Sequence, residues 1–329
     1  MSDDARAPTC HDALFHDAFS RRDAFAAVLR RLLPAQVLPH IDFASLRPAP
    51  TKQTDEVLRT RWPDLRYIVD FVDGDVRVPV HLPLEYQSTP APLLPKRAHG
   101  YVGGVWDEHA KDNPSDDTVP YVLPIAFLQY PARNTPTRLS EIQPMSPRLR
   151  ALLGTPVELT MLVDDFSGSV MDDTEVELPT RAFVELTRAF MHAYKNPGAL
   201  TEARIAELAP LFDVLLEHNR PGDVRTLWVY VTSAFEAGSP LRSLILNAVS
   251  KEVKEEFMTI KDEWVAEGMA EGVAKSLLRL LERRAIAISE AMRMHVLATR
   301  DESQLLRWFD RAVSMTTAEE VFEPLEASG

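Results

Sequence analysis

Cysteine is scarce in this sequence of 329 residues, which contains only Cys10. A lone thiol excludes an internal disulfide framework and any zinc site built from several thiolates. Hydrophobic residues make up 45% of the chain and charged residues 26%, so there is enough apolar material for a sizeable core. This balance excludes a wholly disordered chain. The length suggests two domains, or one large domain with an appendage.

Long hydrophobic runs are also missing. One of the longest, Leu65–Val72, is interrupted by Arg66 and Asp70, and it is far shorter than the roughly 20 apolar residues that a membrane span needs. The first residues, Met1–Pro8, mix acidic and basic side chains and contain no apolar stretch typical of a secretory leader. We therefore expect a cytoplasmic protein with no membrane partner.

Positive charge is in short supply. The chain has 36 Lys and Arg residues against 49 Asp and Glu residues, which gives a formal net charge of −13. Proteins that coat nucleic acid usually present a basic surface, because contacts with phosphates supply most of the non-specific affinity. The charge argues against a dedicated DNA-coating protein. It leaves room for an enzyme with a local basic groove, since the stretch Arg30–Lys111 is nearly neutral.

The order of hydrophobic patterns predicts a mixed α and β region at the start of the chain. Apolar residues recur at helical spacing over His11–Leu33. The next segment, Ile41–Pro50, is expected to be a turn-rich connector, because its two late prolines forbid a continued helix. Over Leu65–Leu84, apolar residues alternate on both sides of an Asp73-Gly74 turn signal, which predicts a two-stranded antiparallel hairpin.

Helical spacing dominates the later part of the chain. A helix is expected at Leu93–Ala110, followed by strands at Tyr121–Tyr130 and Val157–Val163. Further helices are predicted at Ala182–Tyr194, Leu200–Glu217, Val224–Glu236, Leu241–Val249 and Lys251–Arg284. We therefore expect one domain over residues 8–195, a helical region over 196–260 and a helical C-terminal tail domain over 261–329.

Common catalytic signatures are absent from the sequence. It contains no Gly-rich phosphate loop, no G-x-G-x-x-G, no H-E-x-x-H and no G-x-S-x-G. The pairs His11-Asp12 and His16-Asp17 could suggest a metal phosphohydrolase. Such a site needs further ligands of the same kind, and none stands out, so these side chains are expected to be exposed or to cap the helix.

The open end of the predicted hairpin gathers polar residues. Glu85 and Gln87 share a face of their strand because residues two apart point the same way. A two-residue turn at Asp73-Gly74 places Asp64 opposite Pro83, which lies on that same face. A three-residue loop would break this parity. With the two-residue turn, two carboxylates and an amide converge.

This group of side chains suits a hard divalent cation. Mg²⁺ commonly takes one or two carboxylates and completes its coordination with water and phosphate oxygens. Such an ion polarises a phosphodiester and helps to deprotonate the attacking water. The spacing alone favours a structural role, in which Asp64 caps the turn before the strand and Glu85 ends the next strand in solvent.

Several separated segments occur in an order typical of one protein family. They are His11-Asp12-Ala13-Leu14-Phe15 with Phe19, Trp62–Tyr67, Leu84-Glu85-Tyr86-Gln87-Ser88 followed by Arg97 and Tyr101, and the pairs Glu267-Gly268 and Glu271-Gly272. The chain resembles the YhgA-like putative transposases, also called Rpn (recombination-promoting nuclease) proteins, a branch of the PD-(D/E)XK nuclease superfamily. Two departures stand out: Tyr86 replaces the family's His, and Gln129-Tyr130-Pro131 replaces its usual Tyr-x-Gly turn.

The resemblance implies an α/β fold of the restriction-endonuclease type, with a mixed sheet flanked by helices and a helical C-terminal region. It implies that residues 8–195 form the nuclease-like domain and that Asp64 and Glu85 hold a divalent metal, with Mg²⁺ expected and Mn²⁺ or Ca²⁺ as alternatives. Gln87 occupies the usual lysine position, where a neutral amide only positions water or phosphate through hydrogen bonds. Arg97 could contact phosphate or form an ion pair with a neighbouring carboxylate.

The resulting hypothesis is a metal-dependent DNA endonuclease that hydrolyses phosphodiester bonds, with Asp64, Glu85 and Gln87 as its catalytic residues. A homodimer suits this activity, because cutting both strands needs two sites or two events. The acidic C-terminal half then suggests regulation or oligomerisation. The alternative is a catalytically inactive nuclease-fold module that regulates or binds other proteins. Transposition has support only from the family's name.

Overall fold

The computed structural model describes residues 9–51, 63–144, 146, 148, 151–152, 158–236 and 239–322. The chain divides into two compact units, one up to Val253 and one from Lys254 onward. None of the helices within these described ranges is long and apolar enough to cross a membrane.

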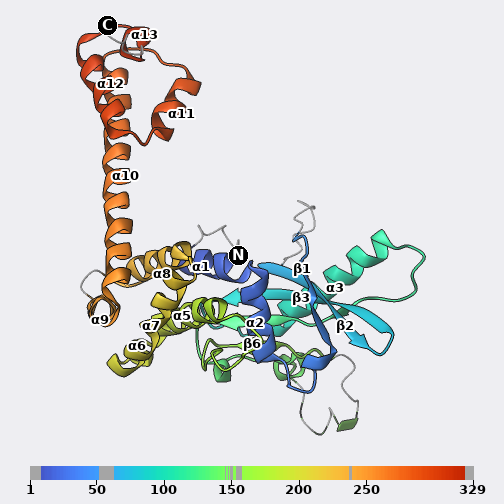
Figure 1. The fold of residues 1–329 in the computed structure, drawn as a ribbon. Helices are drawn as coiled ribbons and strands as arrows, with labels where there is room; N and C mark the ends of the chain where they lie inside the picture. The colour runs from blue at the N-terminus through green and yellow to red at the C-terminus, as the bar shows by residue number, and fades with distance from the viewer. Residues whose placement is uncertain are drawn as a thin grey trace. The chain divides into compact units, whose positions relative to one another are not determined.

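The first unit is built on a mixed sheet (Figure 1). Its strands follow the order β1-β2-β3-β5-β6, and β4 pairs with β3 alongside β5. The first three strands are antiparallel, whereas β4 and β5 run parallel to β3, and β6 runs parallel to β5. The strands are β1 (Ile41–Pro48), β2 (Leu65–Asp73), β3 (Val76–Gln87), β4 (Tyr121–Val122), β5 (Ile125–Leu128) and β6 (Leu162–Asp164).

The predicted hairpin is confirmed, but its register differs from the expected one. Asp73 pairs with Val76, so the turn residues are Gly74 and Asp75 rather than Asp73 and Gly74. Gly74 has φ +58°, the backbone that a two-residue hairpin turn requires at its first central position and that glycine adopts without strain. The turn still contains two residues, so each residue of the hairpin points to the same face of the sheet as predicted.

One face of the sheet packs against the N-terminal helices. Tyr86 of β3 stacks on Phe15 with ring centroids 4.9 Å apart, and its register partner Phe127 stacks on Phe19 at 5.0 Å. On β2, Tyr67 stacks on Phe25 at 4.6 Å. These aromatic side chains are buried and form the centre of this layer.

The other face packs against helix α3 (Leu94–Asp112). Strand β5 turns Ala126 and Leu128 to this side, where they form a buried cluster with Leu94 and Ala98. Glu85 and Gln87 are the register partners of Ala126 and Leu128 on β3, so they point to the α3 side as well. The sheet therefore separates the aromatic core from the face that carries the polar residues of the hairpin.

The helical prediction for His11–Leu33 is confirmed, although the segment is divided into α1 (Cys10–Phe19) and α2 (Arg22–Leu32) by a break at Ser20 and Arg21. The expectation for the next segment is wrong. The segment Ile41–Pro50 is not a connector, because its first eight residues form β1, which pairs with β2 at the edge of the sheet. Proline is tolerated at such an edge position, where no ladder hydrogen bond needs its missing N–H.

The other expected strands are shorter than predicted. Tyr121–Tyr130 contains two strands, β4 and β5, because Pro124 between them donates no backbone hydrogen bond. The predicted strand Val157–Val163 is present as β6, which covers only Leu162–Asp164, and Val157 lies outside the described residues.

The helical prediction for the rest of the chain is confirmed. The first unit continues with α5 (Leu178–Lys195), α6 (Glu202–Leu208), α7 (Pro210–Glu217), α8 (Pro221–Ala234) and α9 (Pro240–Ala248). The single helix expected over Leu200–Glu217 is divided at Pro210, as a helix-interior proline predicts. Short 3₁₀ helices lie at η1 (Leu38–His40), η2 (Ala132–Asn134), η3 (Leu139–Ile142) and η4 (Pro197–Ala199).

The second unit has a hydrophobic core of its own. Helix α10 (Lys251–Arg283) begins just before the boundary and is followed by α11 (Glu290–Ala298), α12 (Glu302–Ser314) and α13 (Ala318–Phe322). Its central residues are Leu277 and Leu281 of α10 and Leu305 and Trp308 of α12, all buried. The division of the chain at residues 195 and 260 remains a prediction.

Candidate active site

The register of the hairpin gives Asp64 and Glu85 neighbouring positions at its open end. Leu65 pairs with Leu84, so the next positions outward along the two strands are Asp64 and Glu85. Asp64 therefore lies across from Glu85 rather than across from Pro83, as the expected register had it. The backbone N–H of Tyr86 donates a hydrogen bond of 2.7 Å to Oδ2 of Asp64, which fixes this carboxylate beside the end of β3.

Three donors in the described part of the chain contact Glu85. Gln87 Nε2 lies 2.7 Å from Oε1, and the guanidinium of Arg97 lies 3.0 Å from the same oxygen. The hydroxyl of Tyr101 donates to Oε2. Arg97 and Tyr101 are four residues apart on α3, so both reach the site from one face of this helix. Glu85 is buried, with 7% of the residue exposed, and these donors compensate for the loss of water.

Gln87 orients the backbone as well as the carboxylate. Its amide nitrogen also donates to the carbonyl oxygen of Tyr86 at 2.7 Å. The side chain at the usual lysine position therefore contacts Glu85 directly, through a neutral group rather than an ammonium ion. Its predicted role toward water or phosphate remains a prediction.

Burial sets the electrostatics of the site. Burial raises the pKa of Asp64 above its ordinary value, and the N–H of Tyr86 opposes this rise. The charges of His16, Asp12 and Arg97 also act on Asp64. Burial, together with the neighbouring Glu85, raises the pKa of Tyr101, which keeps its hydroxyl protonated as a donor.

The sequence did not assign site roles to Asp12, His16 or Tyr101. Asp12 forms a capping box at the start of α1, where its Oδ2 accepts the N–H of Thr9 at 2.7 Å. His16 follows four residues later, so α1 presents both side chains on one face. The sequence suggests these two residues only as part of a metal pair that lacks further ligands, and only the fold places that face within electrostatic reach of Asp64.

A buried polar chain supports the site from the opposite face of the sheet. The Tyr86 hydroxyl donates to Oε1 of Gln129 at 2.9 Å, and Gln129 Nε2 donates to the carbonyl oxygen of Met191 at 3.1 Å. His11 Nδ1 lies 3.3 Å from Gln129 Nε2 and 2.9 Å from the Tyr230 hydroxyl. Tyr86, at the position of the family's His, therefore connects β3 to α5 and α8. His11 is committed to this chain and not to a metal pair.

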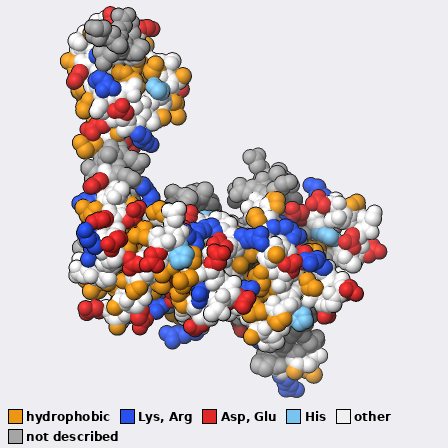
Figure 2. All heavy atoms as spheres, in the orientation of Figure 1, with side chains coloured by type: hydrophobic (Ala, Val, Ile, Leu, Met, Phe, Trp, Pro, Cys, Tyr) orange, Lys and Arg blue, Asp and Glu red, His pale blue; other side chains and the backbone are white. Residues whose placement is uncertain are grey.

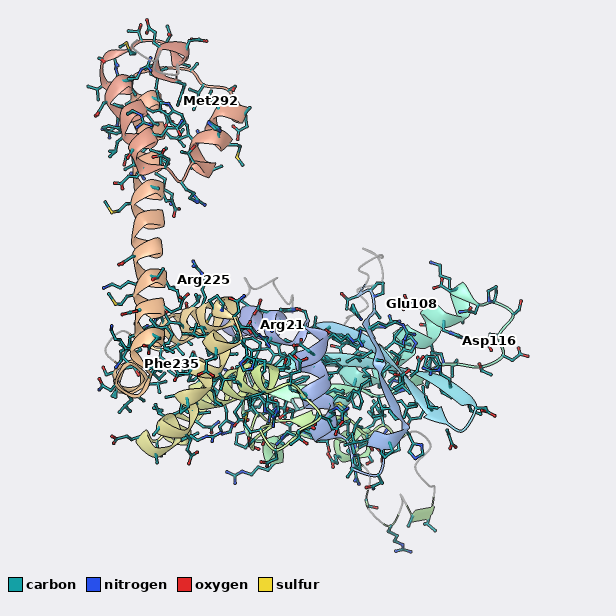
Figure 3. The ribbon with its side chains drawn as sticks, viewed as in Figure 1. Arg21, Glu108, Asp116, Arg225, Phe235 and Met292 are labelled. Atoms are coloured by element: carbon teal, nitrogen blue, oxygen red, sulfur yellow. The ribbon has the colours of Figure 1, made fainter. Side chains whose placement is uncertain are left out.

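Ion pairs hold the surrounding elements in place. Arg21 lies 2.6 Å from Asp223, which ties the junction of α1 and α2 to α8, and Arg66 of β2 pairs with Glu108 of α3. Figure 3 labels Arg21 and Glu108. On the face drawn in Figure 2, a short row of Lys and Arg side chains lies over the middle of the first unit, with acidic side chains around it.

The donor set at the site fits a hard divalent cation. Asp64 and Glu85 supply carboxylate oxygens, and within the described residues Oδ1 of Asp64 accepts no hydrogen bond. The described part of the chain contains no group of three or more His, Cys, Asp or Glu side chains that could hold a metal ion. An ion here would thus depend on two carboxylates, with water and phosphate oxygens completing its shell, which is the usual arrangement for Mg²⁺.

Comparisons with known proteins agree with the sequence motifs. The family described as "Putative transposase, YhgA-like" matches residues 9–195, more than half of the chain. The chain is 25% identical over 284 residues to the "Inactive recombination-promoting nuclease-like protein RpnE" of Escherichia coli (strain K12), an alignment that covers 83% of this chain and 90% of that protein. No solved structure matches. The resemblance is confirmed, and the chain belongs to the YhgA-like transposase family.

Proposed function

We propose that this protein is a metal-dependent DNA endonuclease that hydrolyses phosphodiester bonds. The observation that carries the proposal is the meeting of Asp64 and Glu85 at the open end of one hairpin, with Tyr86 N–H fixing the first carboxylate and α3 fixing the second. Membership of a family of transposase-like and nuclease-like proteins supports it.

Each residue has a distinct role in this proposal. Asp64 and Glu85 hold the divalent cation, expected to be Mg²⁺, with Mn²⁺ or Ca²⁺ as alternatives. The bound ion would polarise the scissile phosphate and lower the pKa of a water molecule. Gln87 holds the Glu85 carboxylate and the backbone of Tyr86 in position. Arg97 supplies the positive charge that a phosphate requires.

The test is cleavage of supercoiled plasmid by the full chain with Mg²⁺, Mn²⁺ or Ca²⁺, and with EDTA as the metal-free control. Asp64→Asn and Glu85→Gln remove one carboxylate each while keeping the shape of the side chain. Asp75→Asn, an exposed change at the far tip of the same hairpin, is the matched control. We expect nicking or linearisation that requires metal, Asp64 and Glu85 but not Asp75. Cleavage that survives both site substitutions would contradict the proposal.

A second candidate function is a nuclease-fold module without catalytic activity. Two observations favour it: Gln87 stands in the usual lysine position, and Glu85 is already neutralised by Arg97. The name of the Escherichia coli relative describes that protein as inactive. A folded wild-type chain that neither binds a divalent metal nor cleaves DNA would establish this second function.

A further inference from the structure

The Glu85 carboxylate has an internal cation as its partner. Arg97 Nη1 lies 3.0 Å from Oε1, and the Arg97 side chain is 23% exposed whereas that of Glu85 is 9% exposed. The guanidinium is thus the more exposed member of this ion pair. Gln87 and Tyr101, which also donate to Glu85 from the described part of the chain, are neutral and add no charge.

A metal ion and the Arg97 guanidinium compete for the same oxygen atom. Two cations at one carboxylate repel each other strongly in a partly buried site, where the dielectric response is weak. The two neutral donors do not create this repulsion. Tyr101 is also fixed by burial, whereas Arg97 has a long and partly exposed side chain that can move away from Glu85.

We propose that Arg97 is an exchangeable latch on the site: it neutralises Glu85 in the metal-free protein and moves to a nucleic-acid phosphate when a divalent cation takes its place. This inference rests on the proposed function, because it assumes that the same carboxylate binds the metal. The phosphate is a suitable acceptor for a guanidinium, with oxygen atoms that match its N–H groups.

The latch makes metal binding and DNA binding interdependent. A metal ion that displaces Arg97 makes the guanidinium available to DNA, and DNA that engages Arg97 makes Glu85 available to the metal. By linkage, each ligand must strengthen the other by the same factor, which for coupled sites is roughly 5- to 150-fold. The free protein would then bind metal weakly and the DNA complex would bind it well.

The first experiment measures Mn²⁺ binding to the full chain without DNA, by electron paramagnetic resonance of the free ion. The variants are Arg97→Gln, which removes the latch, and Arg97→Lys, which keeps its charge. Lys96→Gln is the matched control, since Lys96 is the exposed neighbour on α3 and its loss changes the net charge equally. Glu85→Gln identifies binding at the site, and thermal unfolding confirms that each variant is folded.

We expect Arg97→Gln to bind Mn²⁺ at least about fivefold more tightly than the wild type, the lower end of ordinary coupling. Arg97→Lys and Lys96→Gln should remain close to the wild type. Equal affinities in the wild type and Arg97→Gln, both abolished by Glu85→Gln, would overturn the latch while leaving the metal site and the proposed function intact. Absence of Mn²⁺ binding in every variant would overturn the latch and the proposed function together.

The second experiment measures the coupling with DNA. Fluorescence anisotropy of a labelled duplex, with and without Ca²⁺ and with a gel to verify that the duplex stays intact, gives the factor by which the metal strengthens DNA binding. We expect this factor to be larger for the wild type and Lys96→Gln than for Arg97→Gln. The same factor in all three proteins would show that Arg97 does not pass from Glu85 to phosphate.

Discussion

The hydroxyl of Tyr86 donates a hydrogen bond of 2.9 Å to Oε1 of Gln129, whose side chain is completely buried. The first prediction concerns Tyr86→Phe. This change deletes the hydroxyl, keeps the ring that stacks on Phe15, and leaves Oε1 of Gln129 without its donor inside the core. An unsatisfied buried acceptor costs about 1–3 kcal/mol, so we expect the free energy of unfolding to fall by that amount in urea titrations.

The matched control for Tyr86→Phe is Tyr121→Phe. Tyr121 is 64% exposed on the two-residue strand β4, so water can satisfy the groups around its hydroxyl. The control should leave the unfolding midpoint unchanged. An equal loss of stability in both variants would mean that the bond to Gln129 contributes nothing specific.

A second prediction concerns the buried ion pair between Arg188 and Asp164. Both residues are 1% exposed, and Arg188 also donates to the carbonyl oxygen of Ser167 at 2.9 Å. Arg188→Met removes the guanidinium and leaves the Asp164 charge buried with Arg31, 3.4 Å away, as its one remaining cationic partner among the described residues. Breaking such a pair costs about 3–5 kcal/mol, measurable as a fall in the free energy of unfolding.

The double variant Asp164→Leu with Arg188→Met tests the cause of this loss. If the penalty in Arg188→Met comes from an uncompensated carboxylate, removing the carboxylate as well restores part of the stability, because apolar side chains often replace a buried pair at little cost. Arg31→Met serves as a comparison, since Arg31 is more exposed and its contact with Asp164 is longer. It should destabilise the protein less than Arg188→Met.

The hairpin could be predicted from the sequence because its signals are local. Strict alternation from Val76 onward and a glycine in the turn predict two adjacent strands. The turn lies one residue later than expected, but each side chain still points to the predicted face of the sheet. Strand β1 could not be predicted in this way. Its sequence lacks clear alternation, and its register with β2 shifts between Asp42 and Arg47, so pairing at the sheet edge decides its structure.

The same distinction holds for the candidate site. The parity of the hairpin was enough to predict that Asp64 and Glu85 share a face at its open end, although Asp64 falls opposite Glu85 rather than Pro83. The pairing of Arg97 and Tyr101 with Glu85 depends on how α3 packs on the sheet, and the spacing of residues along the chain does not reveal that packing. The contact between His11 and Tyr230 joins residues 219 positions apart, and no local pattern could indicate it.

A third prediction concerns pH and rests on His81. Burial, helped by the adjacent Arg66 guanidinium, lowers the pKa of His81 from 6.5 to about 4. Arg66 Nη2 lies 3.1 Å from His81 Nδ1, and a guanidinium can only donate, so this nitrogen is an acceptor and the ring is neutral. The folded state therefore disfavours a proton that the unfolded state binds below pH 6.5.

The sign of the pH effect follows from this difference. The stabilisation is fully present above pH 6.5 and is lost as the pH falls from 6.5 through about 4. We expect His81→Gln to reduce the slope of the free energy of unfolding against pH in that window. The buried His11, whose pKa burial also lowers, contributes a parallel slope in both proteins, so the difference between them isolates His81. Identical slopes would show that His81 does not titrate in this window.

The fourth prediction compares two adjacent leucines on α12 in the second unit. Leu305 is completely buried against α10, whereas Leu306 is 43% exposed. Leu305→Ala leaves a cavity in this small core and should cost about 2–5 kcal/mol, while Leu306→Ala removes the same atoms mainly from solvent and should cost far less.

Hydrogen–deuterium exchange of the full chain is the measurement, because it reports on each segment separately. Leu305→Ala should speed exchange in α12 and the C-terminal half of α10 together, since these helices share one core. Equal acceleration by Leu306→Ala would mean that the outer face of α12 is covered in solution by a partner or by another part of the chain.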